Sequence, residues 1–346
     1  MAARNGMERS QDRGGWKALR RPLSAALMAL SLSLPVLAPS AGAWAQGGAD
    51  ATMRVAPTVI ASASIGSTDY RVAGAACEVA REAGGRLCAV APLPSGAAAL
   101  RSVADGLADF ALLRADTYLA ERAVLAQAGQ AVERLAPVMA LHDDVITLIG
   151  TNGLESSEAA ALIGRRINVG APETVTRALW TALEAALGAE PTAFPLRTEL
   201  RAQEAGRALC EGRIEGFLWL LSHPSGATRT LLADCDAQVL NLRGPGIDAL
   251  LAKRPDLRRV VIPSALYGTA LEAETIGTPA LLVAGPHVDD ADVAALARAL
   301  IGNVETLAQR HPSLARIDAR SLISRGIPVP LHPAAAEAYR ALGFTY

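Results

Sequence analysis

Four short turns of this sequence carry hydroxyl and charged side chains at positions where a small anion could bind. Each turn lies between a predicted strand and a predicted helix, at residues 65–70, 94–99, 170–177 and 222–226. A helix N-terminus presents free N–H groups and the positive end of the helix dipole, which together favour carboxylates. The candidate ligand-binding residues in these turns are Ser67, Thr68, Asp69, Tyr70, Ser95, Gly96, Glu173, Thr174, His223 and Ser225.

Arg114 completes this set because it ends a predicted strand, and arginine binds a carboxylate through two parallel hydrogen bonds. Structural roles compete with these functional ones. Asp69 and Glu173 suit the first turn of a helix, where a carboxylate stabilises the helix by about 0.3–1 kcal/mol. Core packing is an equal alternative for Tyr70, and holding the turn is the more frequent role for a residue such as His223.

Enzymatic and metal-binding motifs are absent from the sequence. It has no G-x-S-x-G nucleophile turn, no H-E-x-x-H helix and no G-K-[ST] phosphate loop. The carboxylate pairs Asp143-Asp144 and Asp289-Asp290 fall in predicted polar turns, where charges are usually solvated. No basic block is interleaved with aromatic residues, so nucleic acid binding is not indicated. We therefore predict no catalytic residue, no metal ligand and no cofactor.

Alternating strands and helices must position these turns. Residues 58–114 are typical of a β-α-β-α-β unit, and the apolar strands 135–141 and 145–150 follow, joined by a polar turn at 142–144. Helices are predicted at 155–163, 173–187 and 288–311, and further strands at 214–221, 238–242 and 278–284. This order predicts an α/β fold of two lobes, each a doubly wound sheet, joined by hinge strands. Lobe I would comprise 46–144 with 278–346, and lobe II 145–277.

The N-terminus is typical of a secretory signal peptide. Arg20 and Arg21 precede the apolar run 23–37, and Ala43-Trp44-Ala45 provides a cleavage site after Ala45. We therefore expect residues 1–45 to be removed, 46–53 to form a linker, and the mature protein to be periplasmic. An uncleaved anchor is the alternative.

Four cysteines follow the predicted signal peptide, at positions 77, 88, 210 and 235. In an exported chain an even number indicates disulfides, and four cysteines allow three connectivities. The simplest connectivity pairs the cysteines that are close in sequence, since each disulfide then stays within one lobe.

Three specific motifs are L-C-E-G-R-I-E-G at 209–216, S-H-P-S-G at 222–226 and C-D-A-Q-V at 235–239. They resemble motifs of the TAXI family, the solute receptors of TRAP-type transporters. Further matches are G-R-R-I-N-V-G at 164–170, I-P-x-x-x-Y at 262–267 and P-L-H-P at 330–333. Together they extend over nearly the whole mature chain.

The resemblance implies a type II periplasmic-binding-protein-like fold that closes on a small carboxylate or amino acid and docks on a membrane-embedded TRAP permease. It also implies the pairs Cys77–Cys88 and Cys210–Cys235. The sequence departs from the family pattern at the turns: Ala99 replaces an asparagine, Arg114 a glutamine, and Glu173 adds a negative charge. We therefore hypothesise that Arg114 anchors a carboxylate while Asp69 or Glu173 accepts an ammonium group.

Two other functions fit the same fold. The altered turns favour a sensor or partner-binding protein that no longer serves transport. A cleft enzyme would need a general base, for which the sequence offers no clear candidate.

Overall fold

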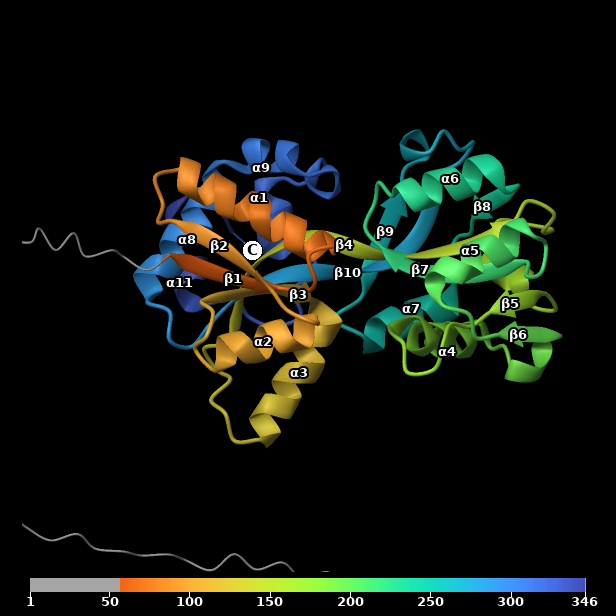
Figure 1. Cartoon of the computed structure of the whole chain (residues 1–346), viewed down its shortest axis with the longest axis horizontal. Helices are drawn as coiled ribbons and strands as arrows, with labels where there is room; N and C mark the ends of the chain where they lie inside the picture. Colours follow the sequence, from red (N-terminus) through yellow and green to blue (C-terminus); the bar gives the residue numbers. More distant parts are fainter. Residues whose placement is uncertain (1–56, 346) are drawn as a thin grey trace, which may run out of the picture. The chain divides into compact units, whose positions relative to one another are not determined.

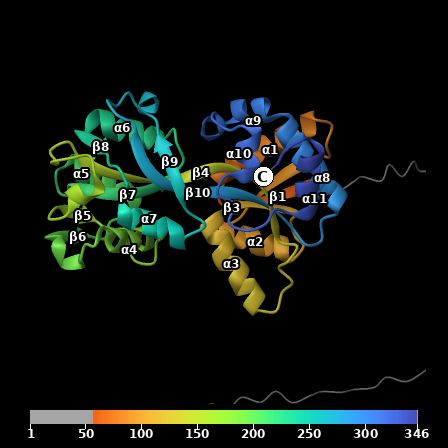
Figure 2. The same ribbon diagram turned by 180° about the vertical axis from the view of Figure 1, so that it is seen from behind.

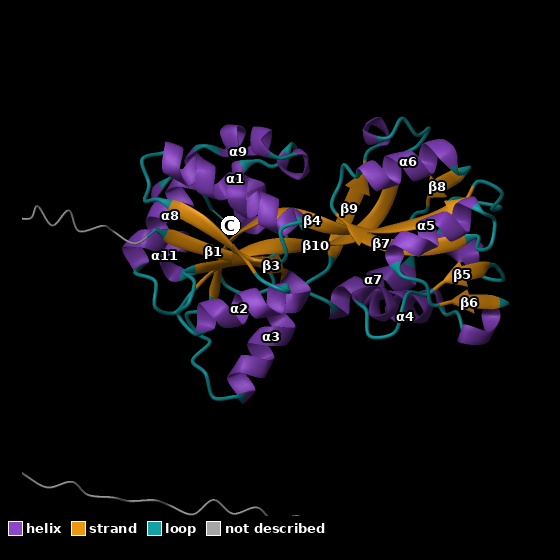
Figure 3. Cartoon of the chain, viewed as in Figure 1, coloured by secondary structure: helices purple, strands orange, loops and turns teal. Residues whose placement is uncertain are grey.

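The computed structural model describes residues 57–345, an α/β arrangement of strands covered by helices (Figures 1 and 3). The predicted signal peptide and linker lie outside the described residues. The strands are β1 (Thr58–Ser62), β2 (Cys88–Pro92), β3 (Phe110–Arg114), β4 (Ala136–Thr151), β5 (Arg166–Asn168), β6 (Leu196–Thr198), β7 (Gly216–Leu221), β8 (Ala237–Val239), β9 (Arg258–Ile262) and β10 (Ala273–Ala284).

Eleven α-helices are described between residues 57 and 345. They are α1 (Thr68–Glu82), α2 (Gly96–Ala104), α3 (Ala115–Gln127), α4 (Val175–Leu187), α5 (Ala202–Cys210), α6 (Gly226–Asp234), α7 (Pro245–Lys253), α8 (Asp290–Gly302), α9 (Val304–Arg310), α10 (Ala319–Ser324) and α11 (Pro333–Ala341). Short 3-10 helices lie at Ala159–Leu162, Pro191–Ala193, Ser264–Leu266 and Pro312–Leu314. None of the described helices has the length and hydrophobicity that crossing a membrane requires.

Two long antiparallel strands, β4 and β10, run through the middle of the sheet, whose order is β2-β1-β3-β10-β4-β7-β5-β6. One end of β10 pairs with β3 and the other with β9, while the second half of β4 pairs with β7 and β8. β1 is parallel to β2 and β3, and β5 is parallel to β6 and β7. The two long strands therefore link two groups of parallel strands.

Separate hydrophobic cores surround the two groups. Around β1 and β3, one core contains α1, α8 and α11 and a second contains α2 and α3, on opposite faces of the strands (Figures 1 and 2). Around β5 and β7, one core includes Trp180 of α4 and the other includes Phe217 and Trp219. The predicted α/β fold with strands joining two groups of elements is confirmed, whereas the lobe boundaries stay a prediction.

Several predicted elements were wrong in extent. The strands predicted at 135–141 and 145–150 are one continuous strand, β4, because its three middle residues keep pairing with β10 despite their polarity. The helix predicted at 288–311 is two helices that meet at Asn303. Residues 155–163 form a single 3-10 turn rather than a helix.

Both disulfides that were predicted by pairing the cysteines closest in sequence are present. Cys77 of α1 bonds Cys88 of β2, and Cys210 at the end of α5 bonds Cys235 after α6. The first ties α1 to the strand beside it. The second closes a loop that contains the turn 222–226.

Candidate functional site

A cavity of about 700 Å³ opens where the N-terminus of α1, the end of β3, the middle of β4 and the turn after β7 meet. Its volume falls in the range of small-molecule sites, roughly 300–1,000 Å³. It is lined by Ala63, Gly66, Ser67, Thr68, Asp69, Arg71, Arg114, Asp144, Leu220, Leu221, Ser222, Pro224, Ser225, Gly226, His311, Pro312 and Ser313. The cavity thus combines two of the four predicted turns with the predicted strand-end arginine.

The N-terminus of α1 forms one wall. Ser67 is the N-cap, and its hydroxyl accepts a hydrogen bond of 3.1 Å from the backbone N–H of Tyr70. Thr68 and Asp69 follow in the first turn and line the cavity. A serine at this position satisfies one of the free N–H groups of the helix, which is the reason for the strong preference for it. The remaining N–H groups and the helix dipole make this wall favourable to an anion.

Arg114 ends β3 with its side chain about 20% exposed. Its Nε and Nη2 each donate a hydrogen bond of 3.0 Å to the carboxylate of Asp116. Burial alone would lower the pKa of Arg114, but the hydrogen bonds and charge of Asp116 raise it above the ordinary value. A guanidinium has five N–H donors, so this pair leaves three of them, including both on Nη1, for another acceptor. Arg114 can therefore bind a ligand carboxylate while Asp116 holds the guanidinium group in place.

Asp69 faces a buried histidine. Nε2 of His142, on β4, lies 3.1 Å from Oδ1 of Asp69, and the His142 side chain is fully buried. Burial opposes protonation of His142, but Asp69 and the nearby Asp144 raise its pKa above the ordinary value. The nearby carboxylates therefore make the charged form of the imidazole more favourable than burial alone would allow.

Asp144 lies two residues further along β4 and lines the same cavity. Its Oδ1 accepts a hydrogen bond of 2.6 Å from the hydroxyl of Ser222. Burial raises the pKa of Asp144, an effect that His142 partly opposes and that the charge of Asp69 reinforces. The neighbouring Asp143 instead pairs with Arg258, which donates a 3.0 Å hydrogen bond from its Nε. The prediction of solvated turn charges at Asp143-Asp144 was wrong, because both residues lie within a strand and face cavities or partners.

The turn 222–226 forms the opposite wall and is held by aromatic and hydroxyl groups. Nε2 of His223 lies 2.9 Å from Oγ1 of Thr147, and its Nδ1 bonds the hydroxyl of Tyr267. The same hydroxyl accepts a 2.7 Å hydrogen bond from the backbone N–H of Ser225. Burial lowers the pKa of His223 to about 4, so it is neutral at pH 7. The His223–Pro224 peptide bond is cis.

Ser225 is the N-cap of α6, and its hydroxyl accepts a 3.2 Å hydrogen bond from the N–H of Thr228. It lines the cavity together with Ser222. His223 lies behind the turn rather than on the cavity wall, which fits the structural role considered for it. Tyr267, part of the I-P-x-x-x-Y motif, is therefore a support of this wall that sequence reasoning noted but gave no role.

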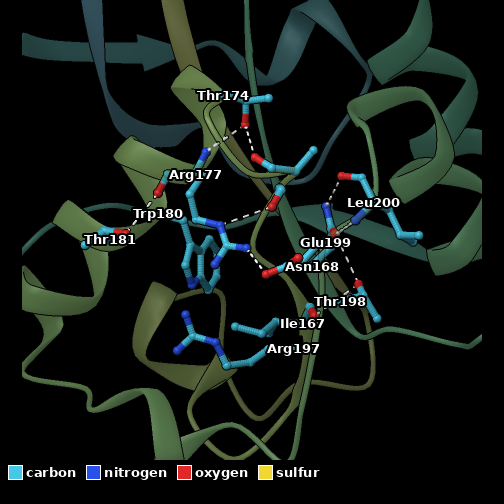
Figure 4. Close-up of polar contacts among 12 residues, drawn as sticks. Ile167, Asn168, Thr174, Arg177, Trp180, Thr181, Arg197, Thr198, Glu199 and Leu200 are labelled. Carbon is cyan, nitrogen blue, oxygen red and sulfur yellow. Dashed lines mark hydrogen bonds and ion pairs between the residues drawn. The ribbon is translucent and has the colours of Figure 1, made fainter. Parts of the chain in front are cut away.

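The third predicted turn does not contribute to this cavity. Figure 4 shows the polar contacts around Thr174 and Arg177 in this turn. Thr174 is exposed; its hydroxyl donates to the carbonyl of Ala171 at 2.7 Å and accepts from the N–H of Arg177 at 3.3 Å. Arg177 donates in turn to the carbonyl of Gly170 at 3.2 Å and pairs with Glu199. Glu173 is exposed and has a left-handed backbone with φ of 61°. The polar groups of this turn are thus bound to one another.

The second predicted turn and Tyr70 also lie outside the cavity lining. Ser95 is the N-cap of α2, accepting a 3.2 Å hydrogen bond from the N–H of Ala98. Gly96 lies against Leu113, where a Cβ would come 3.0 Å from that side chain. The ligand roles of these residues, like those of Glu173 and Thr174, stay predictions.

Sequence reasoning missed Arg71, Asp144, His311 and Ser313 as cavity residues. The interruption of an apolar run by His142-Asp143-Asp144 was the available signal for Asp144, since polar residues in the middle of a buried strand require a partner or a cavity. No comparable signal marks the segment at 311–313, which sequence reasoning placed at the end of a helix. Within residues 57–345 no group of three or more His, Cys, Asp or Glu side chains could hold a metal ion.

Several solved structures have a fold similar to that of this chain. A TctC solute-binding protein from Polaromonas matches with a TM-score of 0.51 at 15% identity, covering 83% of this chain and 98% of that one. The aliphatic sulphonate-binding protein SsuA from Escherichia coli gives 0.44 at 14%, covering 82% and 78%. MatC from Rhodopseudomonas palustris, with bound malate, gives 0.46 at 14%, covering 83% and 96%.

The fold is therefore that of the type II periplasmic binding proteins, as the sequence predicts. The model of the NMT1-like family matches residues 60–343. The chain belongs to this family.

Proposed function

We propose that this protein is a periplasmic solute receptor that binds a small carboxylate or amino acid in the cavity described above. The observation that carries the proposal is the meeting, in one cavity of about 700 Å³, of the α1 N-terminus, Arg114 and the turn 222–226. These elements come from both groups of strands that β4 and β10 link. A ligand that contacts both would favour a closed arrangement over an open one, because it gains contacts on both sides only when they approach.

The proposed lobes are 46–144 with 278–346 and 145–277. Both proposed boundaries fall inside single strands: 144/145 lies in β4 and 277/278 in β10. Two strands that continue from one group of elements to the other are suitable hinges, since a small backbone rotation in each is enough to change the width of the cavity. The structural similarity to solute-binding proteins supports this reading of the fold.

Export is supported by two features. The first is the signal-peptide pattern at 1–45, and the second is the pair of disulfides, which persist in oxidising compartments such as the periplasm. The TAXI-like motifs at 209–216, 222–226 and 235–239 support delivery of the ligand to a TRAP-type permease. The assignment of a TRAP-type permease as the partner depends on these motifs.

Native mass spectrometry of the mature protein, purified from the periplasm without denaturation, tests whether it retains a small molecule. Thermal-shift screening against dicarboxylates, monocarboxylates and amino acids then identifies the class of ligand. We expect stabilisation by at least one carboxylate-bearing compound, and its loss in Arg114→Ala. If no carboxylate raises the unfolding temperature and no small molecule co-purifies, the proposal is wrong.

A sensor or partner-binding role is the second candidate. It is favoured by the partners that two cavity residues already have within the protein, Asp116 for Arg114 and His142 for Asp69. A protein that binds no small molecule in the screen but forms a complex with another exported protein would support this role.

A further inference from the structure

We infer that Asp144 accepts the ammonium group of the ligand, so that the cavity selects α-amino acids over simple carboxylic acids. This inference rests on the proposed function and concerns the same cavity. It differs from the sequence hypothesis, which assigned the ammonium group to Asp69 or Glu173.

The acidic side chains around the cavity differ in their partners. Asp69 faces His142 at 3.1 Å, and Asp116 is bound by two hydrogen bonds from Arg114. Asp143, on the other side of β4, is bound by Arg258. Asp116 and Asp143 thus each bind an arginine, and Asp69 lies beside an imidazole whose pKa is raised.

Asp144 differs from them. Among residues 57–345 it forms no ion pair, and its described hydrogen bond is to the neutral hydroxyl of Ser222 through Oδ1. Oδ2 receives no hydrogen bond from any described residue. A partly buried carboxylate without a cationic partner is unfavourable unless it is protonated or a cation is supplied from outside. A ligand ammonium group would supply that cation.

Glu173 cannot serve in the same way at this cavity. It is exposed, lies in the turn before α4 and does not line the cavity. Asp69 lines the cavity, but an ammonium group there would have to compete with His142, whose raised pKa favours its charged form. Because Asp144 forms no ion pair within the described residues, it is a better acceptor for the ligand ammonium group than Asp69.

The strand register places Asp144 within reach of the proposed carboxylate anchor. Ala280 of β10 pairs with Arg114 on one side and with His142 on the other, so β3 and β4 flank β10 at this level. Asp144 lies two residues from His142, opposite Thr278. Arg114 and Asp144 both line the cavity, and the charge of Asp144 contributes to raising the pKa of Arg114. An α-amino acid carries its two charges on adjacent carbons and would fit between them.

Matched ligand pairs that differ only in the ammonium group provide the test. They are L-aspartate with succinate, L-glutamate with glutarate, and L-leucine with 4-methylpentanoate. Isothermal titration calorimetry on the mature protein gives Kd for each. We expect at least one amino acid to bind about tenfold or more tightly than its partner acid, as expected from a charge-assisted contact of about 1.5–3 kcal/mol.

Asp144→Asn then tests the residue. The amide keeps an oxygen that can accept from Ser222 but removes the negative charge. We expect the amino acid to lose about 10–100-fold in affinity while its partner acid keeps or gains affinity. Glu173→Gln is the matched control, and it should leave both constants unchanged. Thermal unfolding of each variant confirms that it is folded.

The outcomes separate the inference from the proposed function. If wild type binds both members of every pair with equal affinity, the inference is wrong and the receptor function stands. If Glu173→Gln rather than Asp144→Asn reduces the preference, Glu173 is the acceptor and the inference is again wrong. If none of the six acids binds, the ligand class in the proposed function fails, and the inference fails with it. The comparison of paired ligands on wild type does not depend on the folding of any variant.

Discussion

The turns 170–175 and 222–226 are chemically alike but structurally different. Each follows a strand, and each ends in a hydroxyl residue that caps a helix, Thr174 for α4 and Ser225 for α6. The first is exposed, and its polar groups bond to one another (Figure 4). The second lines the cavity and is held from behind by Tyr267.

The difference shows that an N-cap pattern predicts a helix start but does not by itself predict a site. Hydroxyl N-caps occur wherever a helix begins, because they satisfy its free N–H groups. The turn 222–226 becomes part of a cavity because it follows β7, which pairs with β4, and because Tyr267 holds it from behind.

Replacing the two arginines near these turns, Arg114 and Arg177, should have the most different effects on ligand affinity. Arg114→Ala is expected to weaken binding of a carboxylate ligand about 100-fold, because it removes a charge-assisted bidentate contact worth about 3 kcal/mol. Arg177→Ala should change the dissociation constant by less than about twofold, since Arg177 contacts its own turn and Glu199. Calorimetric titration of the two variants measures this directly. Equal losses would show that the turn 170–175 belongs to the site.

The disulfide that encloses the turn 222–226 should contribute strongly to stability. Replacing Cys210 and Cys235 with serine opens a loop with a sequence separation of 25 residues. The chain-entropy model predicts a loss of about 3 kcal/mol in the free energy of unfolding. Urea unfolding of the double variant against wild type gives the value. An unchanged transition midpoint would contradict the prediction.

Part of the pH dependence of stability should arise at the turn 222–226, from His223. The pKa of His223 is lowered by burial from 6.5 to about 4, so the unfolded chain binds a proton that the folded protein does not. Stability from this group is therefore complete above pH 6.5 and lost as the pH falls toward 4, by about 2–3 kcal/mol.

Because His142 has a raised pKa, it acts in the opposite sense, and its stabilisation is lost as the pH rises through that value. The difference between wild type and His223→Gln, measured by urea unfolding from pH 4 to 8, isolates His223. This difference should decrease toward low pH. A constant difference would show that His223 titrates normally.

The two cap residues should give equal effects on stability and unequal effects on binding. Thr174→Ala and Ser225→Ala each remove an N-cap hydrogen bond, at a cost of about 1 kcal/mol. Only Ser225→Ala is expected to weaken ligand binding, by a few-fold, because Ser225 lines the cavity. Thermal unfolding and titration of the two variants test both statements. A loss of affinity in Thr174→Ala would remove the distinction between the turns.

Much of the fold could be predicted from the sequence because it depends on local patterns. Apolar runs marked β1, β3 and β7, and glycine or serine residues marked the helix ends. The cysteine pairs were also predictable, since close spacing and the family resemblance agreed. The continuous strand β4 was not, because three polar residues at 142–144 have the local pattern of a turn, and only pairing with β10 keeps them extended.

The site was predictable in part for a similar reason. Ser67, Asp69, Arg114 and Ser225 stand at strand and helix ends, where sequence patterns are informative, and all four line the cavity. The roles of Asp144 and Tyr267 depend on contacts between segments far apart in the chain, such as the 2.7 Å bond from Ser225 to Tyr267. No periodicity within one segment records such contacts.

If the proposed receptor function is correct, the alternation of side chains along β4 has a consequence for how the protein could diversify. Asp143 and Asp144 are adjacent, yet a strand directs neighbours to opposite faces, so one binds Arg258 and the other lines the cavity. A single-codon change at Asp144 would alter the charge offered to a solute without disturbing the ion pair next to it. Relatives could thus acquire new nutrient preferences through one substitution, at little cost to folding.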